Sequence, residues 1–533
     1  MDTTGREWEV AGKKVGKECA KFTYRAAGND DIQTRPSTDP QSIPVIAPSC
    51  SDFLRVARPG LRVPLAMQIP AGGASPFAVY QAFRKKGRGA LLETGRGMGR
   101  SVVAVDIAGE WTFAATDSGD PFGQLRQLCS DNPIAPNPLL RRFGGGLIGW
   151  FSYDLCRVIE RIPTLAADDL QLPLCYFQLV DSFIEFDHQR GVLTLATLPV
   201  LHDGDMAAQY RQMEARLQEM MEVLSTLPPP EADTPPDTTH ADPLAFAPTV
   251  TPDQFAATVR RTREYIFAGD IFQANLSVRF QRAFGTDPLL LYRQLRKINP
   301  SPFMAFIEGG DCAVVSASPE LLLRASGPTI ETRPIAGTRR RGATEAEDQE
   351  KIAELLANEK ERAEHLMLVD LERNDIGRVA RYGTVQVNEL MTVEKYSHVI
   401  HIVSNVCGEL REGMDTLDAL RACFPGGTIT GAPKVRSMEI IEELEPTRRG
   451  IYTGSIGWLG WNGDAEFNIA IRTLLVKNGV AYLQAGAGIV ADSVPEHEYR
   501  ESLRKAQAAM NAVESALAQE EKEKGREKEV AAG

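Results

Sequence analysis

A proline-rich, polar stretch divides the 533-residue chain into two patterned halves. It is LPPPEADTPPDTTHADP, from Leu227 to Pro243, and a run of this composition cannot bury a hydrophobic core. We therefore predict an N-terminal domain over residues 1–227, a linker over 228–248, a larger second domain over 249–518 and a charged tail over 519–533. The last residues, EEKEKGREKEVAAG, are expected to be frayed.

Both halves contain strand-like and helix-like patterns. In the first half, runs such as RSVVAVDIAGEWTFAATD and LCYFQLVDSFIEFDHQRGVLTLATL resemble strands, and MAAQYRQMEARLQEMMEVLSTL has helical periodicity. The second half begins with TPDQFAATVRRTREYIFAGD, a predicted helix ended by Gly269, and continues with strands such as MAFIEGGDCAVVSAS. Because strands and helices do not alternate regularly, the pattern predicts an α+β fold with sheets covered by helices.

The composition excludes some classes of function. Acidic residues outnumber basic ones by 71 to 59 and no block rich in lysine or arginine stands out, which argues against a nucleic-acid-binding protein. No apolar run is long enough for a membrane span, and the N-terminal MDTTGREWEVAGKKVGKECAK lacks the apolar segment of a secretory signal. The eight cysteines are scattered without a Cys-x-x-Cys pair, which indicates reduced thiols and a cytoplasmic protein.

Two pairs of glutamates share the same spacing on predicted helices. Glu361 and Glu364 lie in NEKERAEHLM, and Glu498 and Glu501 lie in EHEYRES. Residues three apart lie on one face of a helix, so the carboxylates of each pair point the same way. Two interpretations are open. Either the glutamates form a solvated face with counter-charges, or they are ligands of a hard cation such as Mg²⁺, which prefers carboxylate oxygen atoms.

Small-residue segments provide candidate ligand-binding turns. CFPGGTITGAPK differs from a nucleotide-binding P-loop in the residues before Lys434, but its backbone N–H groups, with Thr428 and Lys434, are suited to hold a carboxylate. A second predicted turn, in QAGAGIV, contains Gly486, Ala487 and Gly488, and a third, in ETRPIAGTRRRG, contains Ala336, Gly337 and Thr338. Glycine lets the backbone approach a ligand closely in such turns.

Cationic side chains occur among apolar residues in two further segments. EFNIAIRTLLV predicts a strand that buries Arg472, and a buried arginine needs a carboxylate partner from the protein or from a ligand. EKYSHVIHIVS contains His398 and His401. Each histidine is structural unless it faces a ligand pocket, where it would be a candidate general acid or base.

Together these segments resemble the chorismate-utilising enzymes. The resemblance extends from LLETG at Leu91 to Glu514 and is densest after Thr251. It implies antiparallel sheets covered by helices, as in anthranilate synthase component I, with an N-terminal domain and a larger chorismate-binding domain. The matching run is PIAGTRRRG … NEKERAEHLMLVDLERNDIGRVARYG … EKYSHVIHIVSNV … FPGGTITGAPK … GSIGW … NIAIRT … AGAGIVADSVPEHEYRE.

The resemblance also implies roles for individual residues. The four glutamates match the family's Mg²⁺ ligands, and His401, not His398, matches its acid–base histidine. The ring side of bound chorismate matches Gly337, Thr338 and Thr428. The side of the enolpyruvyl carboxylate matches Tyr452, Arg472, Gly486, Ala487 and Gly488.

Two positions bear on the reaction. Gln273 stands where the salicylate and isochorismate enzymes carry a lysine that activates water, which favours ammonia as the nucleophile. Ala336 stands where some aminodeoxychorismate synthases carry a lysine nucleophile and anthranilate synthases carry alanine. However, EPTRRGIYTGSIGW and LLETGRGMGRSVVAVD resemble the aminodeoxychorismate subgroup. We therefore expect 4-amino-4-deoxychorismate, for folate synthesis, from chorismate and ammonia; the alternative product is anthranilate, for tryptophan synthesis.

The resemblance further implies a second ligand site and a protein partner. LLET with NPSPFM is similar to the family's tryptophan pocket, with Thr94 in place of serine and Phe303 in place of tyrosine, beside Pro302 and Met304. None of the cysteines lies in the Gly-x-Cys-x-Gly motif of a glutaminase. A separate glutamine amidotransferase subunit is therefore the implied source of ammonia.

Overall fold

The computed structural model describes residues 45–95, 99–228, 239–395 and 399–532. Pro44–Gly533 forms one compact unit, and its 21 described strands are joined by pairing into one hydrogen-bonded network. The division into domains at residues 227 and 249 stays a prediction. Outside the described residues lie His398, Cys19 and most of the proline-rich stretch.

Strand β6 (Cys175–Asp187) is the junction of the network. β4 (Arg100–Phe113) pairs along one edge of β6, while β5 (Gly146–Phe151) and then β7 (Val192–Thr197) share the other edge. β7 continues the sheet to β2 (Leu65–Pro70) and β1 (Ile46–Ala47). Two long arms of strands therefore leave β6, one through β4 and one through β5.

The first arm runs from β4 to the strands that carry Gln273 and Gly486. In order of pairing it contains β3 (Gly89–Glu93), β10 (Phe303–Gly309), β11 (Cys312–Ser318), β20 (Thr473–Lys477), β21 (Val480–Ile489) and β9 (Gln273–Ala283). The short strands β8 (Ala247–Pro248) and β17 (Gly431–Ala432) pair with β9.

The second arm runs from β5 to the strands that carry His401 and Thr338. It contains β18 (Ser455–Gly460), β19 (Ala465–Asn468), β12 (Leu321–Ser326), β13 (Thr329–Arg333) and β16 (Val399–Glu409), and β16 pairs further with β14 (Ile335–Arg340) and β15 (Gln386–Lys395). Every pairing between these strands is antiparallel, as the resemblance implied.

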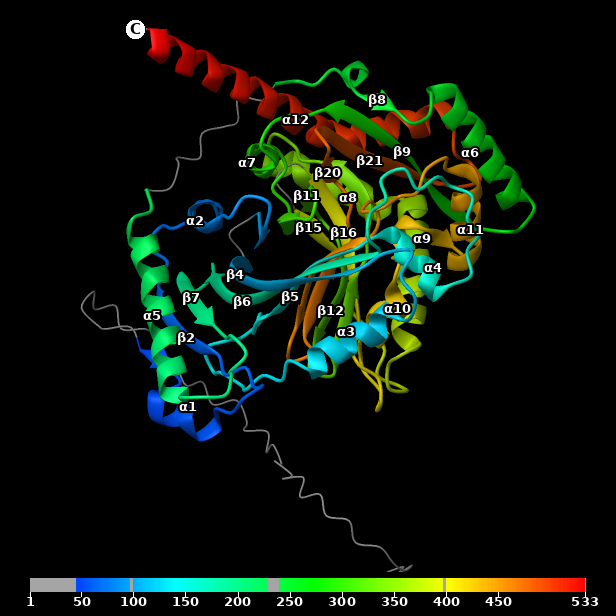
Figure 1. Ribbon diagram of the computed structural model, residues 1–533. Helices are drawn as coiled ribbons and strands as arrows, with labels where there is room; N and C mark the ends of the chain where they lie inside the picture. Colours follow the sequence, from blue (N-terminus) through cyan, green and yellow to red (C-terminus); the bar gives the residue numbers. More distant parts are fainter. Residues whose placement is uncertain (1–44, 96–98, 229–238, 396–398, 533) are drawn as a thin grey trace, which may run out of the picture. The chain divides into compact units, whose positions relative to one another are not determined.

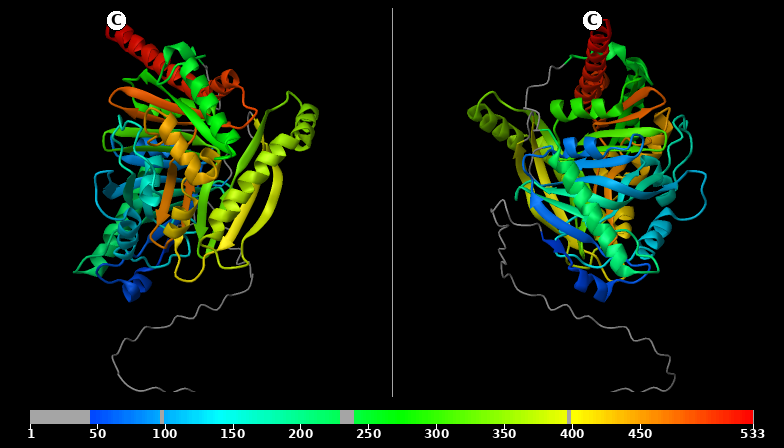
Figure 2. Two further views of the ribbon diagram at one scale, coloured as in Figure 1. Left: turned by 90° about the vertical axis from the view of Figure 1, so that its right-hand side faces the viewer. Right: turned by 60° about the vertical axis from the view of Figure 1, so that its left-hand side comes forward.

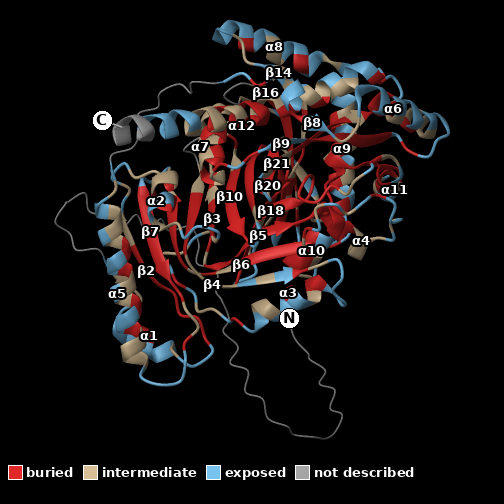
Figure 3. Ribbon diagram, turned by 45° about the horizontal axis from the view of Figure 1, so that its top comes forward, coloured by how far each residue is buried: buried red, intermediate tan, exposed pale blue. Residues whose placement is uncertain are grey.

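Alternation along the strands of the first arm builds two hydrophobic cores. Ile307 and Val314 point into a core shared with Phe467 of the second arm, so this core fills the space between the two arms. Their neighbours Phe306 and Val315 point into another core, under the covering helices. Successive side chains of a strand face opposite sides of the sheet, so strands buried on both faces are apolar throughout. In Figure 3 the strands are accordingly buried while the outer helix faces are exposed.

The helices cover the outer faces of this network (Figure 1). α5 packs on β7 and β2, and α12 packs on β21 and α7. α9 packs on β14 and β16 of the second arm (Figure 2). The helices are α1 (Cys50–Val56), α2 (Pro76–Phe83), α3 (Pro121–Ser130), α4 (Cys156–Ile159), α5 (Met206–Ser225), α6 (Pro252–Phe267), α7 (Pro288–Ile298), α8 (Glu345–Ala357), α9 (Glu359–Gly377), α10 (Thr416–Cys423), α11 (Lys434–Leu444) and α12 (Pro495–Ala532), with 3-10 turns η1 (Tyr153–Leu155), η2 (Pro243–Ala245) and η3 (Gly427–Ile429).

The fold class predicted from the sequence is confirmed, with one local correction. α6 begins with a capping box between Thr251 and Gln254 and ends before Gly269, which has a positive φ. The C-terminal tail, expected to be frayed, is instead helical to Ala532 as the end of α12. None of the described helices combines the length and the apolar character that crossing a membrane requires.

Candidate active site

The two predicted glutamate pairs lie near the N-termini of two helices from different arms. α9 begins after Asn358, whose side chain accepts a hydrogen bond from the N–H of Glu361 at 3.0 Å. Glu361 Oε1 accepts from Arg339 Nη1 at 3.0 Å. On α12, Glu501 lies 2.9 Å from Lys505 Nζ, one turn further on. The helical prediction for both pairs is therefore confirmed.

Electrostatic interactions link the two pairs across the arms. Burial raises the pKa of Glu364, and the nearby carboxylates of Glu361 and Glu501 raise it further. Burial likewise raises the pKa of Glu498, with a contribution from Glu501. A cation would relieve this repulsion, and carboxylate oxygen atoms suit Mg²⁺. In the part of the chain that the structure describes, no cluster of three or more such side chains is present, and the two pairs supply the type of donor atom that Mg²⁺ prefers.

His401 is held in place by the edge of the second arm. It is buried on β16, opposite Thr338 of β14. Its Nδ1 lies 3.1 Å from the carbonyl oxygen of Gly337 and 3.0 Å from the Thr338 hydroxyl. Because a carbonyl oxygen only accepts, this geometry favours the proton on Nδ1 and the lone pair on Nε2 whenever the ring is neutral.

Two of the predicted small-residue turns are strands in the structure. Ala336, Gly337 and Thr338 belong to β14, with a bulge at Gly337, whose φ is 63°. The segment Gly486–Gly488 belongs to β21, paired with β9 throughout. The turn predictions were wrong because cross-strand hydrogen bonds outweigh the weak strand propensity of glycine. Gly337 lacks a side chain for a steric reason: a Cβ atom there would lie 3.1 Å from Glu361 Oε2.

The segment Gly486–Gly488 of β21 and the paired part of β9 form one surface of the site, called the floor below. The two glycines leave this surface with little side-chain bulk. A Cβ atom at Gly488 would lie 2.4 Å from Gln273 Nε2, and one at Gly486 would lie 2.9 Å from the Tyr452 hydroxyl. The side chains of Gln273 and Tyr452 thus extend over this floor only because glycine stands beneath them. Lys505 Nζ also reaches the floor, at 3.0 Å from the carbonyl oxygen of Gly486.

The predicted residues of the segment Cys423–Lys434 separate into two groups. Thr428, in η3, lies beside the carboxyl group of Glu320, and its hydroxyl group lowers the pKa of that carboxyl group. Lys434 Nζ instead contacts Asp375 at 2.6 Å and the carbonyl oxygen of Cys423 at 3.0 Å. The charge of Lys434 is therefore balanced by a buried carboxylate inside the protein.

Arg472 differs from its prediction in two respects. It lies between β19 and β20, not in a strand, with a φ of 52°, and its side chain is partly exposed. Its guanidinium group lies within electrostatic reach of the buried carboxyl group of Glu320. Its charge lowers the pKa of that carboxyl group, so the expected acidic neighbour is present.

Sequence reasoning missed Glu320 and Lys505. Glu320 is buried between β11 and β12, and burial raises its pKa to about 7 despite Thr428, the N–H of Ile335 and Arg472. A carboxyl group with such a pKa can donate a proton near neutral pH. The available signal was an acidic residue inside ASPELLL, an otherwise apolar run. For Lys505 the signal was its position four residues after Glu501, on the same helix face.

The buried side chain of Arg449 holds the segment 449–453, which carries Tyr452 and is called the Tyr452 wall below, against neighbouring elements. Its guanidinium group binds Glu445 through Nε at 2.9 Å and through Nη2 at 2.7 Å. It also donates to the carbonyl oxygen of Asn275 at 2.6 Å, to that of Ile429 at 3.0 Å and to the Thr453 hydroxyl at 3.3 Å. These bonds use all five N–H donors of an arginine.

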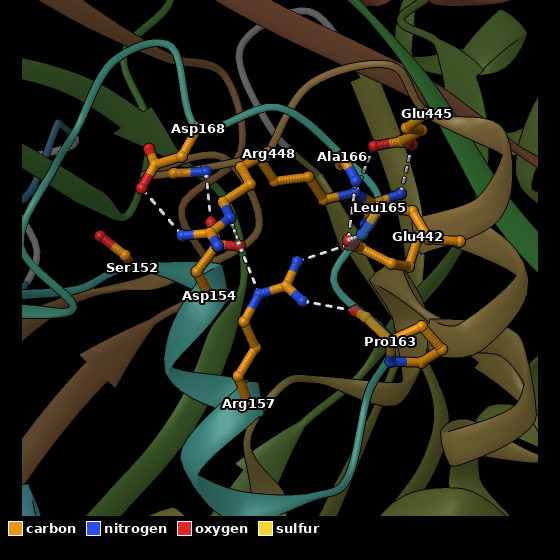
Figure 4. Close-up of polar contacts among 12 residues, drawn as sticks. Ser152, Asp154, Arg157, Pro163, Leu165, Ala166, Asp168, Glu442, Glu445 and Arg448 are labelled. Atoms are coloured by element: carbon orange, nitrogen blue, oxygen red, sulfur yellow. Dashed lines mark hydrogen bonds and ion pairs between the residues drawn. The ribbon is translucent and has the colours of Figure 1, made fainter. Parts of the chain in front are cut away.

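A second network joins Arg157 and Arg448 to carboxylate partners from distant parts of the chain (Figure 4). Arg157 donates to Asp154 at 3.1 Å and to Glu442 at 2.5 Å, and Arg448 donates to Asp168 at 2.8 Å. Asp154 also accepts from the N–H of Gly450 at 3.0 Å. The backbone just before Tyr452 is therefore fixed to the N-terminal half of the chain.

The residues predicted for a tryptophan pocket are brought together. Met304 pairs with Glu93 in the β10–β3 ladder, which places Thr94 near Phe303 and Pro302. The N–H of Gly95 donates to the carbonyl oxygen of Ser301 at 2.8 Å. No contact in the described ranges identifies a ligand for this pocket, so tryptophan binding stays a prediction.

Similar proteins cover most of the chain. The family described as chorismate binding enzyme matches residues 88–511. Aminodeoxychorismate synthase component 1 of Bacillus subtilis (strain 168) is 46% identical over 478 residues, which cover 86% of this chain and 99% of that protein. Anthranilate synthase component 1 of Acetivibrio thermocellus is 40% identical over 475 residues, covering 85% and 96%. The crystal structure of anthranilate synthase component I from Streptococcus pneumoniae has a TM-score of 0.68 at 35% identity, covering 83% and 99%.

Proposed function

Because the chain belongs to the chorismate-binding enzymes, we propose that it converts chorismate and ammonia into 4-amino-4-deoxychorismate, a precursor of 4-aminobenzoate and folate. The family that the motif order indicated is thereby confirmed. The relative from Bacillus subtilis, which carries this name, is 46% identical, against 40% for the anthranilate synthase component 1 of Acetivibrio thermocellus.

The observation that carries the choice of nucleophile is Gln273. Its buried amide cannot remove a proton from water, as a lysine amine could, but its oxygen atom can accept a hydrogen bond from ammonia. Ammonia is a nucleophile without prior deprotonation. The site is therefore suited to form a C–N bond rather than a C–O bond.

Residues of both arms have complementary roles in this proposal. Glu320 donates its proton to the C4 hydroxyl, which leaves as water while ammonia forms the new C4–N bond and then loses a proton. Tyr452, Arg472 and Lys505 bind and orient the carboxylates of chorismate. Glu361, Glu364, Glu498 and Glu501 would hold Mg²⁺, which supplies positive charge for the ring carboxylate when bound.

Anthranilate formation is the second candidate because of Ala336 and His401. Ala336 excludes a covalent lysine intermediate at that position, and the lone pair of His401 Nε2 is suited to move the proton whose loss accompanies release of pyruvate. In that reaction ammonia adds at C2 of chorismate while the C4 hydroxyl leaves as water, and loss of the C2 proton then accompanies release of pyruvate.

An end-point assay separates the two products. Chorismate, Mg²⁺ and ammonium are incubated with the protein, and fluorescence is read with and without aminodeoxychorismate lyase. We expect 4-aminobenzoate only when the lyase is present. Anthranilate in the absence of the lyase would make the second candidate correct, and no turnover in either assay would refute both.

The proposal extends to the partner and to the compartment. Free ammonia is scarce at neutral pH, and "component 1" in the relative's name indicates a second subunit. We propose that a separate glutamine amidotransferase delivers the ammonia. We also propose a cytoplasmic location, which the free thiols of Cys50, Cys129, Cys156, Cys175, Cys312, Cys407 and Cys423 support.

A further inference from the structure

Asn275 stands two residues after Gln273 on β9, so the two side chains lie on the same face of the strand. Asn275 is buried, with 8% of its surface exposed. Among the described residues, no hydrogen-bond partner is within reach of Asn275 Oδ1 or of Gln273 Oε1. Buried acceptors without a donor destabilise a folded protein, so two of them on one face indicate a ligand that donates hydrogen bonds.

The orientation of the Asn275 amide is determined by its other atom. Nδ2 donates to the carbonyl oxygen of Thr428 at 3.5 Å, and because a carbonyl oxygen only accepts, the nitrogen atom must face Thr428. Oδ1 therefore faces the opposite way, over β21. A Cβ atom at Gly486 would lie 2.8 Å from Oδ1 and 2.9 Å from the Tyr452 hydroxyl. Glycine at this position keeps the space in front of Oδ1 open.

The backbone beneath this space is held firmly. The carbonyl oxygen of Asn275 accepts from Arg449 at 2.6 Å, and its N–H donates to the carbonyl oxygen of Thr430 at 2.8 Å. Cross-strand pairing with Gly488 fixes the register of the strand. Oδ1 is therefore presented by a rigid element, as a group that positions a reactant must be.

Asn275 Oδ1 and Gln273 Oε1 both accept hydrogen bonds, so the reactant that they bind must be a hydrogen-bond donor. A carboxylate of chorismate presents only acceptor oxygen atoms at neutral pH, so Asn275 Oδ1 and Gln273 Oε1 would repel it. The C4 hydroxyl of chorismate presents one O–H group, whereas ammonia presents three N–H groups and can donate to both acceptors at once. We propose that Asn275 Oδ1 and Gln273 Oε1 form an acceptor pair that binds and orients ammonia, with Asn275 as its second member. This inference rests on the proposed function, because it assumes that ammonia is the nucleophile.

The test is Asn275→Leu, which has the same branching and the same number of heavy side-chain atoms but no acceptor. Turnover of chorismate is measured at fixed pH while ammonium is titrated at saturating chorismate, and then chorismate at saturating ammonium. Losing one hydrogen bond is expected to raise KM for ammonium about tenfold and to leave KM for chorismate unchanged. Asn132→Leu is the matched control. Asn132 is also 8% exposed, but it accepts a hydrogen bond from Arg62 in the N-terminal half of the chain and has no part in the proposed site.

The outcomes separate this inference from the proposed function. An equal rise in both KM values would overturn the inference, because Asn275 would then contact chorismate or maintain the whole site, and an unchanged KM for ammonium would overturn it too. A wild-type protein without ammonium-dependent turnover would overturn the proposed function itself. If Asn275→Leu does not fold, as judged by circular dichroism, Asn275→Ser replaces it, with the same rise expected for ammonium because its hydroxyl is too short to reach the same point.

Discussion

At the scale of single residues, Glu320 has an environment very different from that of a surface carboxylate. Its pKa of about 7 means that roughly half of the molecules hold the proton at neutral pH. If Glu320 donates that proton, the activity must fall as pH rises through about 7. We predict this falling limb in kcat, and we expect Glu320→Gln to lower kcat by roughly 10²- to 10⁴-fold. A variant that keeps wild-type kcat would exclude Glu320 as the acid.

Glu372 provides a second prediction, on stability. It is buried, accepts from the Thr332 hydroxyl at 3.0 Å, and has its pKa raised from 4.5 to about 8 by burial and by Asp375. A raised carboxyl pKa means that the folded state keeps a proton that the unfolded state releases above pH 4.5. The free energy of unfolding should therefore fall as pH rises from about 4.5 to 8. We expect Glu372→Gln to reduce that fall by on the order of 2 kcal/mol.

Urea unfolding at pH 5 and pH 8 measures this effect. Glu372 lies outside the groups proposed to contact substrate, so Glu372→Gln isolates the linkage from catalysis. Gln is neutral at both pH values and keeps an acceptor for Thr332. Equal pH dependence in the two proteins would show that Glu372 ionises normally in the folded state.

At the scale of elements, Arg449 joins the segments that carry the proposed substrate contacts. It links β9 through Asn275, η3 through Ile429 and the Tyr452 wall through Thr453. Lysine keeps the charge but lacks the planar fork of five donors. We predict that Arg449→Lys lowers kcat/KM for chorismate about 100-fold, because small displacements of positioned groups have effects of this size. The Mg²⁺ requirement should not change, since α9 and α12 carry its glutamates.

Arg62→Lys is the matched control for Arg449→Lys. The side chains of Arg62 and Arg449 are 2% and 1% exposed. Arg62 likewise binds a carboxylate, Asp181, at 2.6 Å and lies over an aromatic ring, that of Trp461, at 4.8 Å. We expect the two variants to lose similar stability in thermal unfolding, while only Arg449→Lys loses activity. Equal losses of activity would assign Arg449 a general structural role.

The elements also show what the sequence could and could not predict. The helices that carry Glu361, Glu364, Glu498 and Glu501 were predictable because helical periodicity is a local property. The strand around Gly337 was not, because its identity depends on a partner strand from a distant part of the chain. Glu320 was missed for a related reason. Its raised pKa arises from burial by both arms, and burial by distant segments leaves no local pattern.

The proposed Mg²⁺ ligands lie on two separate helices, α9 and α12, and one substitution tests whether they act together. We expect Glu501→Gln to abolish turnover at limiting Mg²⁺, because the substitution removes one negative charge from the four proposed Mg²⁺ ligands. Glu501 is close enough to Glu364 on the other helix to raise its pKa. Titration of Mg²⁺ in the chorismate assay measures the effect, and excess Mg²⁺ should restore part of the rate. Glu496→Gln is the control, since Glu496 lies on the same helix but is exposed and contacts Arg260.

At the scale of the whole molecule, the two arms meet at the site from opposite sides of one core. The first arm supplies Gln273, Asn275 and, through α12 packed on β21, Glu498 and Glu501. The second arm supplies His401, Thr338 and, through α9, Glu361 and Glu364. In the proposed function, a Mg²⁺ ion held by both glutamate pairs would join α9 of the second arm to α12 of the first, and the carboxylates of these two helices already influence one another.

This proposed link predicts an effect of ligands on both helices that hydrogen–deuterium exchange can measure. Mg²⁺ with chorismate should slow exchange in the first turns of α9 and α12 together, because the ion draws on both helices, while α5, which packs on β7 and β2, should be unaffected. Glu364→Gln should reduce the protection of α12 as well as that of α9, although the substitution is on α9 alone. Protection of α9 without α12 would mean that the metal binds one glutamate pair only, and that the two arms are not coupled through it.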